Sequence, residues 1–134
     1  MKYLLLIYLN EQTWAQQTEA ERQEIYREYR ELIQELTAAG KYLSGSQLQP
    51  TTTATTVQVR NGKQLVTDGP FAETREQLGG YFIVESIDLE EAIRIAGRIP
   101  SARVGSIEVR PLSEGTDSNE NRTSVIEQAS LELG

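Results

Sequence analysis

The sequence has no cysteine and no histidine among its 134 residues. Without cysteine, disulfides, thiol nucleophiles and thiolate metal sites are excluded. Without histidine, the chain lacks the usual general base near neutral pH and the commonest metal ligand in proteins. We therefore expect no metal site, and any acid–base chemistry must come from carboxylates, tyrosines or lysines.

Basic residues are also few, with 13 lysines and arginines against 20 acidic residues and a net charge of −7. An acidic chain repels phosphate groups, which argues against nucleic acid and against an anionic membrane surface as partners. The apolar run at residues 3–9 is too short to span a bilayer and lacks the cleavage site of a signal peptide. We expect a cytoplasmic protein.

Polar–apolar alternation is missing from two strand-like segments, residues 2–9 and 81–84, which are apolar at almost every position. Successive side chains of a strand point to opposite faces of the sheet, so both faces of these strands must be covered. We expect both strands in the middle of a sheet.

Two segments have the spacing of amphipathic helices. The first follows a capping box at residues 18–21 and ends at Gly40. The second begins after Asp88 and ends before Pro100. Its inward-facing residues are predicted to be Leu89, Ala92, Ile93, Ala96 and Ile99.

The remaining strands are predicted near residues 46–48, at 51–60 and 63–67 around an Asn-Gly hairpin turn, and at 107–110. This order favours an α+β sandwich with both helices on one face of an antiparallel sheet. Two helices cover only one face, yet the central strands are apolar on both. A second copy with the same apolar face is the simplest cover, which predicts a homodimer.

The hairpin leads into a turn at Asp68-Gly69-Pro70, since Gly69 accepts a positive φ and Pro70 ends the strand. Phe71 is expected to anchor the turn in the core, and an exposed charged segment with Glu73 and Arg75 follows. One interpretation is a rigid connection in which the Asp68 carboxylate accepts backbone N–H bonds. The other is that Asp68 and this loop line a pocket.

Residues 67–81, Thr-Asp-Gly-Pro-Phe-Ala-Glu-Thr-Arg-Glu-Gln-Leu-Gly-Gly-Tyr, closely resemble the signature of the DGPF-domain proteins within the YCII-related family. The opening Met-Lys-Tyr-Leu-Leu-Leu-Ile-Tyr, Ala-Thr-Thr-Val at residues 54–57 and Ile-Glu-Val-Arg-Pro at 107–111 are similar to the same family. The resemblance implies a ferredoxin-like domain that pairs as a dimeric α/β barrel. Similar proteins are often encoded beside extracytoplasmic-function sigma factors, which implies an accessory or sensor role.

Asp68 is the leading acid–base candidate because it lies at a strand end beside an aromatic ring. Glu85 and Glu108 are expected to form ion pairs, with Arg110 or Arg60 as partner. The residues predicted to bind a ligand are Gly69, Phe71, Glu73, Arg75, Tyr81, Tyr8 and Arg110. The glycine pair at residues 79–80 is too isolated to indicate a phosphate site, and we expect no cofactor.

Two functions follow. The first is a homodimeric small-molecule-binding or sensor module with a cleft near the Asp68 loop. The alternative is an enzyme of the dimeric-barrel type, an isomerase, a lyase or a dehydrohalogenase-like catalyst of proton transfer, that uses Asp68. Some YCII-related proteins resemble enzymes with a His–Asp pair, and this chain departs from them because it has no histidine.

Residues 1–112 are predicted to form the domain, and residues 113–134 a polar tail. Residues 113–123 have the composition of a linker, and residues 124–133 have the spacing of a short amphipathic helix.

Overall fold

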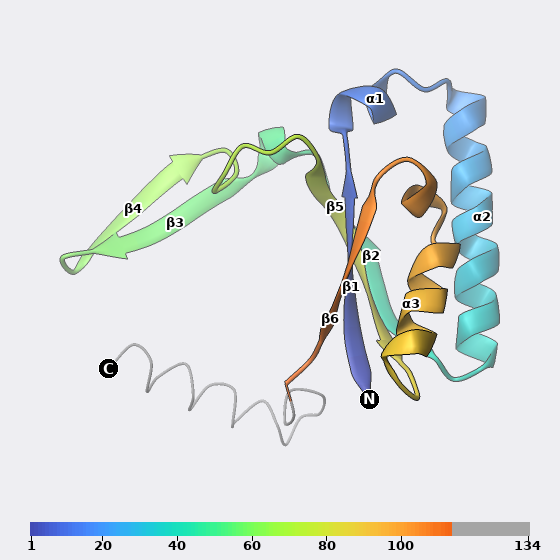
Figure 1. The fold of residues 1–134 in the computed structure, drawn as a ribbon. Coiled ribbons are helices and arrows are strands. Elements are labelled where there is room, and N and C mark those ends of the chain that lie inside the picture. Colours follow the sequence, from blue (N-terminus) through green and yellow to red (C-terminus); the bar gives the residue numbers. More distant parts are fainter. Residues whose placement is uncertain (114–134) are drawn as a thin grey trace.

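The computed structural model describes residues 1–113 and has an α+β, ferredoxin-like arrangement (Figure 1). In chain order the elements are β1 (Lys2–Leu9), α1 (Glu11–Ala15), α2 (Glu19–Ala38), β2 (Tyr42–Gln47), β3 (Thr55–Arg60), β4 (Lys63–Asp68), β5 (Gln77–Glu85), α3 (Leu89–Arg98) and β6 (Ser106–Pro111), with 3₁₀ turns at Thr51–Thr53 and Pro100–Arg103. The predicted fold class is confirmed.

The main layer is a four-stranded antiparallel sheet in the order β2-β5-β1-β6. β1 and β5 lie in the middle, as their apolar character on both faces predicts. The register is marked by Leu5, which lies opposite Phe82 of β5 and Val109 of β6. Leu5 is fully buried, so the centre of the sheet is also the centre of the core.

The long helices α2 and α3 cover one face of this sheet (Figure 1). The predicted capping box begins α2: the Glu21 N–H donates to Thr18 Oγ1 at 3.1 Å, and the Thr18 N–H donates to Glu21 Oε1 at 3.4 Å. The core between helices and sheet consists of Tyr3, Leu5, Ile7, Leu32, Leu36, Phe82, Val84, Ala92, Ile95, Ala96 and Ile99.

The buried face of α3 differs from the predicted one. Ala92 and Ala96 are buried as predicted, but Leu89 and Ile93 are 49% and 53% exposed. Ile95 is buried in their place. The inward stripe therefore runs from Ala92 through Ile95 and Ala96, a helical spacing that leaves Leu89 and Ile93 at its edge.

Three strand boundaries also differ from the predictions. β3 begins at Thr55 rather than at residue 51, because Thr51–Thr53 form a 3₁₀ turn. β2 covers Tyr42–Gln47, whereas the sequence predicts a short strand only near residues 46–48. β5 begins at Gln77 rather than at residue 81, so the two glycines lie inside a strand. A Cβ on Gly80 would lie 2.9 Å from the carbonyl oxygen of Ser46, so close backbone pairing requires glycine there.

The short helix α1 lies between β1 and α2, in a segment where the sequence analysis predicts no helix. Asn10 caps it by accepting the Thr13 N–H at 3.1 Å. A helix of five residues is too short to show apolar periodicity, so nothing in the hydrophobic pattern indicates it.

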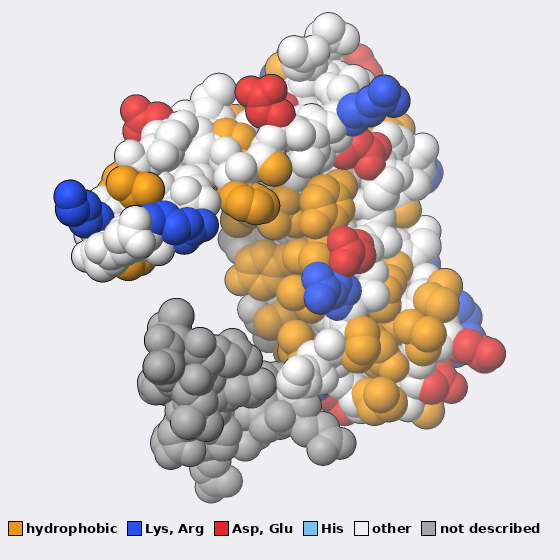
Figure 2. Space-filling view, turned by 60° about the vertical axis from the view of Figure 1, so that its left-hand side comes forward, with side chains coloured by type: hydrophobic (Ala, Val, Ile, Leu, Met, Phe, Trp, Pro, Cys, Tyr) orange, Lys and Arg blue, Asp and Glu red, His pale blue; other side chains and the backbone are white. Residues whose placement is uncertain are grey.

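The second face of the sheet carries the alternate side chains of β1, the half-buried Leu4, Leu6 and Tyr8. Within residues 1–113, no helix covers this face (Figure 1). Hydrophobic side chains gather on it, in the hollow beside the hairpin (Figure 2). We call it the open face of the sheet.

Strands β3 and β4 form a separate two-stranded hairpin that projects from the body (Figure 1). Its turn is the predicted Asn61-Gly62 pair, with φ angles of 53° and 73°, as two-residue hairpin turns require. The hairpin exposes Val57, Val59 and Val66, at 53%, 61% and 61%.

The predicted linker and short helix in the tail lie outside the described residues, apart from Ser113. The boundary of the domain at residue 112 stays a prediction. In the described part of the chain, no helix is long and apolar enough to cross a membrane.

Candidate functional site: an aromatic cavity beside a polar hollow

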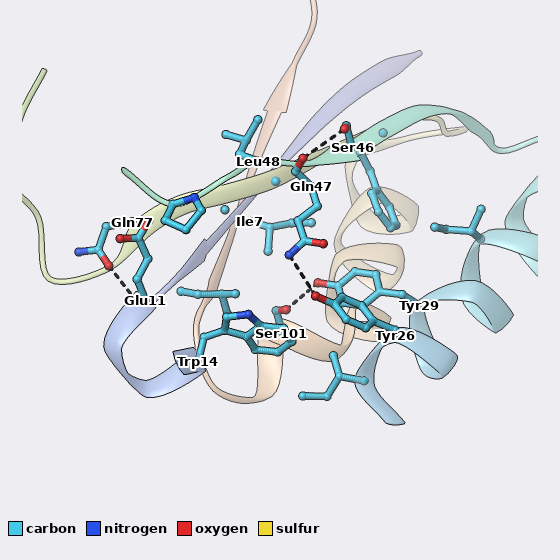
Figure 3. Close-up of a pocket in the computed structure, with 18 of the residues that line it drawn as sticks. Ile7, Glu11, Trp14, Tyr26, Tyr29, Ser46, Gln47, Leu48, Gln77 and Ser101 are labelled. Atoms are coloured by element: carbon cyan, nitrogen blue, oxygen red, sulfur yellow. Dashed lines mark hydrogen bonds between the residues drawn. The ribbon is translucent and has the colours of Figure 1, made fainter. Parts of the chain in front are cut away.

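A cavity of about 300 Å³ lies between α2 and the sheet, next to α1 (Figure 3). We call it the aromatic cavity, because its walls include the rings of Trp14, Tyr26, Tyr29, Tyr42 and Phe82. Small-molecule sites in proteins are typically concave and apolar, with a few polar groups that orient the ligand. The size and composition of this cavity fit that description.

Ring contacts hold these walls in place. Trp14 meets Tyr26 edge-on, with ring centroids 5.7 Å apart. Phe82 makes edge contacts with Tyr42 at 5.2 Å and with Tyr29 at 6.1 Å. Such contacts fix the relative orientation of the rings, so the cavity exists before any ligand enters.

Two tyrosines of the cavity, Tyr26 and Tyr29, are paired with neutral polar groups. The Tyr29 and Ser101 hydroxyls are 2.6 Å apart, and Gln47 Nε2 donates to the Tyr26 hydroxyl at 3.4 Å (Figure 3). Burial raises the pKa of the Tyr29 phenol, against the lowering effect of its bond with Ser101. Burial also raises the pKa of Tyr42. Both phenols therefore remain protonated at neutral pH.

Glu11 supplies the charge in the cavity, and its carboxylate is held in place by Thr51. Glu11 Oε1 accepts the Thr51 N–H at 2.8 Å, and Oε2 accepts the Thr51 hydroxyl at 2.7 Å. The Glu11 N–H donates to Gln77 Oε1 at 3.0 Å. These bonds join α1 to β5 and to the 3₁₀ turn that precedes the hairpin.

A second, more open hollow of about 450 Å³ adjoins the cavity, since Glu11 and Gln77 line both. We call it the polar hollow. The loop between β4 and β5 forms much of its wall, with Gly69, Glu73 and Arg75 among the lining residues. The cavity and the loop that the sequence singles out are therefore neighbours.

One hydrogen bond joins that loop to the start of α1, and a second joins it to the start of β5. Asn10 Nδ2 donates to the carbonyl oxygen of Arg75 at 3.3 Å. Gln77 Nε2 donates to the carbonyl oxygen of Thr74 at 2.6 Å. Asn10 and Gln77 thus place the predicted loop beside the cavity, and no motif in the sequence indicates either role.

Asp68 ends β4 and is exposed, and Phe71 is 83% exposed. The expected anchoring of Phe71 in the core is wrong, because the loop after β4 runs outside the sheet (Figure 1).

Gly69 has the expected positive φ, 101°. Its N–H donates to the Ala54 carbonyl oxygen at 2.8 Å, and its carbonyl oxygen accepts the Thr56 hydroxyl at 2.8 Å. Within residues 1–113, the Asp68 carboxylate makes no hydrogen bond or ion pair, so these bonds hold the turn instead.

Tyr8, Tyr81 and Arg110 belong to the strands whose alternate side chains form the open face, and they line neither the cavity nor the hollow. In the sheet register, Tyr81 lies opposite Leu6 of β1. Arg110 Nε lies 3.6 Å from Glu108 Oε2, an ion pair within one strand rather than across strands. Of the predicted binding residues, Gly69, Glu73 and Arg75 line the polar hollow. Phe71 lines neither the cavity nor the hollow. The roles of all these residues stay predictions.

The aromatic cavity itself was missed by sequence reasoning. Its lining residues Glu11, Trp14 and Gln47 belong to no motif in the sequence. The signal that could have indicated the cavity is the set of glycines on β2 and β5: Gly45, Gly79 and Gly80 line it and place no side chains there.

The fold and the cavity define an α+β protein of the ferredoxin-like type with a small-molecule-sized cavity between helix and sheet. The chain matches the YCII-related domain over residues 1–116. It is 36% identical over 115 residues to an uncharacterized protein of Rhizobium meliloti (strain 1021), and the match covers 84% of this chain and 93% of that protein. The chain belongs to the YCII-related domain family, as the resemblance of residues 67–81 implies.

Proposed function

We propose that this YCII-related protein is a homodimeric small-molecule-binding module, in the role of a sensor or accessory protein, with its ligand in the aromatic cavity. The observation that carries the proposal is the ring-lined cavity of about 300 Å³. Its neighbour, the polar hollow, is walled by the loop that follows Asp68 and gives a ligand room for a polar substituent.

Binding without turnover suits the groups in the cavity. The raised pKa values of Tyr29 and Tyr42 make these phenols poor bases at neutral pH. Both carboxylate oxygens of Glu11 already accept hydrogen bonds from Thr51. In the described residues, no group of three or more acidic side chains could hold a metal ion. For the enzyme alternative, the exposed Asp68 would need a second titratable group from a partner subunit.

The first experiment uses the one tryptophan of the chain as a reporter. Trp14 lines the cavity, so its indole N–H resonance should shift when benzyl alcohol, a small neutral aromatic probe, is titrated into ¹⁵N-labelled protein. We expect saturable shifts that include Trp14 and the residues around it. Shifts scattered over the surface, or none at millimolar probe, would count against a ligand in this cavity.

A cavity-filling variant tests the location. Gly79 lines the cavity, and a Cβ there would meet only Leu9 Cδ1 at 3.7 Å and the Ile7 carbonyl oxygen at 3.8 Å, which are ordinary contacts. Gly79→Ala should therefore fold and weaken the binding of benzyl alcohol. Gly97→Ala on α3 is the matched control, since nothing lies within 4 Å of its added Cβ. Equal binding by both variants would place the probe elsewhere.

The homodimer rests on the open face of the sheet. Leu4 and Leu6 are half-buried there, and hydrophobic side chains gather on this face in the hollow beside the hairpin (Figure 2). Contiguous apolar surface of this kind typically marks an interaction site, and a twofold partner presents the same surface. Light scattering on the intact chain should give about twice the 15.0 kDa chain mass.

A pair of charge substitutions distinguishes this face from others. Leu6→Glu places a charge on the open face and should yield a monomer with unchanged secondary structure. Ile93→Glu places the same charge on the exposed side of α3, where Ile93 is 53% exposed, and should leave the dimer intact. A wild-type monomer that is stable and soluble would contradict the dimer. Dissociation of the Ile93 variant would place the interface on the helical side.

A further inference from the structure

We infer that the aromatic cavity selects an organic cation, an amine or alkylammonium group attached to a small apolar body, over a neutral or anionic molecule of similar size. The inference rests on the proposed function, because it names the class of ligand for the same cavity. It depends on three features: the distribution of charge in the walls, the chemistry of the rings and the volume.

The charge in the walls has one sign. Among the described residues that line the cavity, Glu11 is the only charged side chain, and no lysine or arginine is present. A carboxylate or phosphate ligand would lose its water without gaining a cationic partner, at a large cost in free energy. A cation would instead gain a fixed carboxylate. The net charge of −7 adds an attraction of the same sign over a longer range.

Thr51 holds the Glu11 carboxylate without neutralising it. Its N–H and hydroxyl occupy one acceptor site on each oxygen, at 2.8 and 2.7 Å. An ionised carboxylate has about four acceptor sites, so the remaining ones are available to an ammonium group. Because Thr51 carries no charge, the negative charge of Glu11 is preorganised and left uncompensated by this contact.

The rings add a second attraction for a cation. The faces of tryptophan and tyrosine rings are electron-rich, and they attract ammonium groups within about 6 Å. Trp14 and Tyr26 come from α1 and α2, while Tyr42 and Phe82 come from the sheet, so rings approach the cavity from both layers. The phenols stay neutral because burial raises the pKa of both Tyr29 and Tyr42, so they donate or accept hydrogen bonds without adding charge.

The volume limits the apolar body. A cavity of about 150 Å³ accepts a benzene-sized molecule in another protein, and this one is about 300 Å³. One or two small rings, or an aliphatic group of similar bulk, would fill it. The ammonium group would then lie near Glu11, where the cavity meets the polar hollow. The hollow adds one arginine, Arg75, and one further carboxylate, Glu73, so the charge around this junction stays negative.

The test compares three probes with the same ring and nearly the same size at pH 7: benzylammonium, benzyl alcohol and benzoate. Their affinities are measured from the Trp14 indole resonance and by calorimetry on the full chain. We expect benzylammonium to bind at least about tenfold tighter than benzyl alcohol, the scale of a hydrogen bond to a charged group, and benzoate to bind weakest. Added salt should weaken only the binding of the cation.

The variant Glu11→Gln tests whether this carboxylate causes the preference for a cation. The amide oxygen can still accept a hydrogen bond from Thr51, so the local structure should persist. We expect about a tenfold loss of affinity for benzylammonium, the energy of one charged contact, and no change for benzyl alcohol. Glu90→Gln is the control, because it removes the same charge from the exposed first turn of α3.

The outcomes separate this inference from the proposed function. If no probe shifts Trp14, the cavity is not a ligand site and both fail. If benzyl alcohol and benzylammonium bind equally, or benzoate binds best, the cavity binds ligands but the inference is overturned. If Glu11→Gln does not fold, the ranking of the probes and its salt dependence in the unaltered protein decide the matter.

Discussion

Trp14 stands edge-on to Tyr26, with ring centroids 5.7 Å apart and planes inclined at 70°. This contact joins α1 to α2 and closes one side of the aromatic cavity (Figure 3). Because Trp14 is half-buried, Trp14→Ala should lower the free energy of unfolding by about 2 kcal/mol. Trp14→Phe keeps a ring at this position and should lose less. Urea melts with matched m-values measure both, and an unchanged midpoint for the alanine variant would contradict this role.

Gly80 and Gly97 give opposite predictions for the same substitution. A Cβ on Gly80 would lie 2.9 Å from the Ser46 carbonyl oxygen, a backbone atom that cannot move without breaking the β2–β5 pairing. Gly80→Ala should therefore cost about 1–3 kcal/mol. Gly97 lies in α3 with nothing within 4 Å of an added Cβ, so Gly97→Ala should stabilise by about 0.5–1 kcal/mol. Urea midpoints that moved in the same direction would show that backbone approach is not the cause.

The ion pair between Lys41 and Glu91 predicts a pH dependence. Lys41 Nζ lies 2.7 Å from Glu91 Oε1, and the Glu91 side chain is only 14% exposed. The hydrogen bond from Lys41 is the main reason that the pKa of Glu91 falls below its usual value of 4.5, and a bond from the Ile87 N–H adds to it. A carboxyl whose pKa is lowered on folding stabilises the folded state above its unfolded pKa and loses this effect as the pH falls through its folded pKa.

Glu91→Gln should therefore lower the melting temperature at pH 7. The difference from the unaltered protein should remain down to the usual glutamate pKa of 4.5 and then shrink as the pH falls further. Glu90→Gln, on the exposed side of the same turn, should show a smaller difference at every pH. If the melting temperature of Glu91→Gln fell further below that of the unaltered protein as the pH decreased, the pKa of Glu91 would not be lowered by folding.

The apolar run of β1 was enough to predict the layout of the fold. In β1, Tyr3, Leu5 and Ile7 are buried, and Leu4 and Leu6 between them are half-buried on the other face. A central strand that is apolar on both faces has this pattern. The long helices α2 and α3 were predictable as well, since caps and periodicity are local signals.

The candidate site lay beyond such reasoning because its residues act only after distant segments meet. Glu11 and Gln77 are unremarkable in sequence, yet they form the wall between the cavity and the hollow because β1 and β5 pair in a particular register. The buried face of α3 was predicted incorrectly because Ile93 and Ile95 are equally apolar in the sequence. Only packing against the sheet determines that Ile95 is the buried one.

Asp68 provides the last prediction, because sequence and structure give it different surroundings. The sequence suggests a carboxylate that accepts backbone N–H bonds in the turn, in which case its loss would be costly. In the described part of the chain it is exposed and has no such bond, while Gly69 is held by Ala54 and Thr56. Asp68→Asn and Asp68→Ala should therefore both leave the free energy of unfolding within about 0.5 kcal/mol of the unaltered protein, as surface substitutions usually do.

Thr56→Val is the matched comparison for Asp68, because it removes the hydroxyl that donates to the Gly69 carbonyl oxygen at 2.8 Å and keeps the shape of the side chain. It should cost about 1 kcal/mol, the net contribution of one hydrogen bond. A larger loss for Asp68→Ala than for Thr56→Val in urea melts would mean that the carboxylate holds the turn after all. If Asp68→Asn instead raised the free energy of unfolding, the charge of Asp68 would be kept at the expense of stability, and Asp68 would be the first place to look for chemistry.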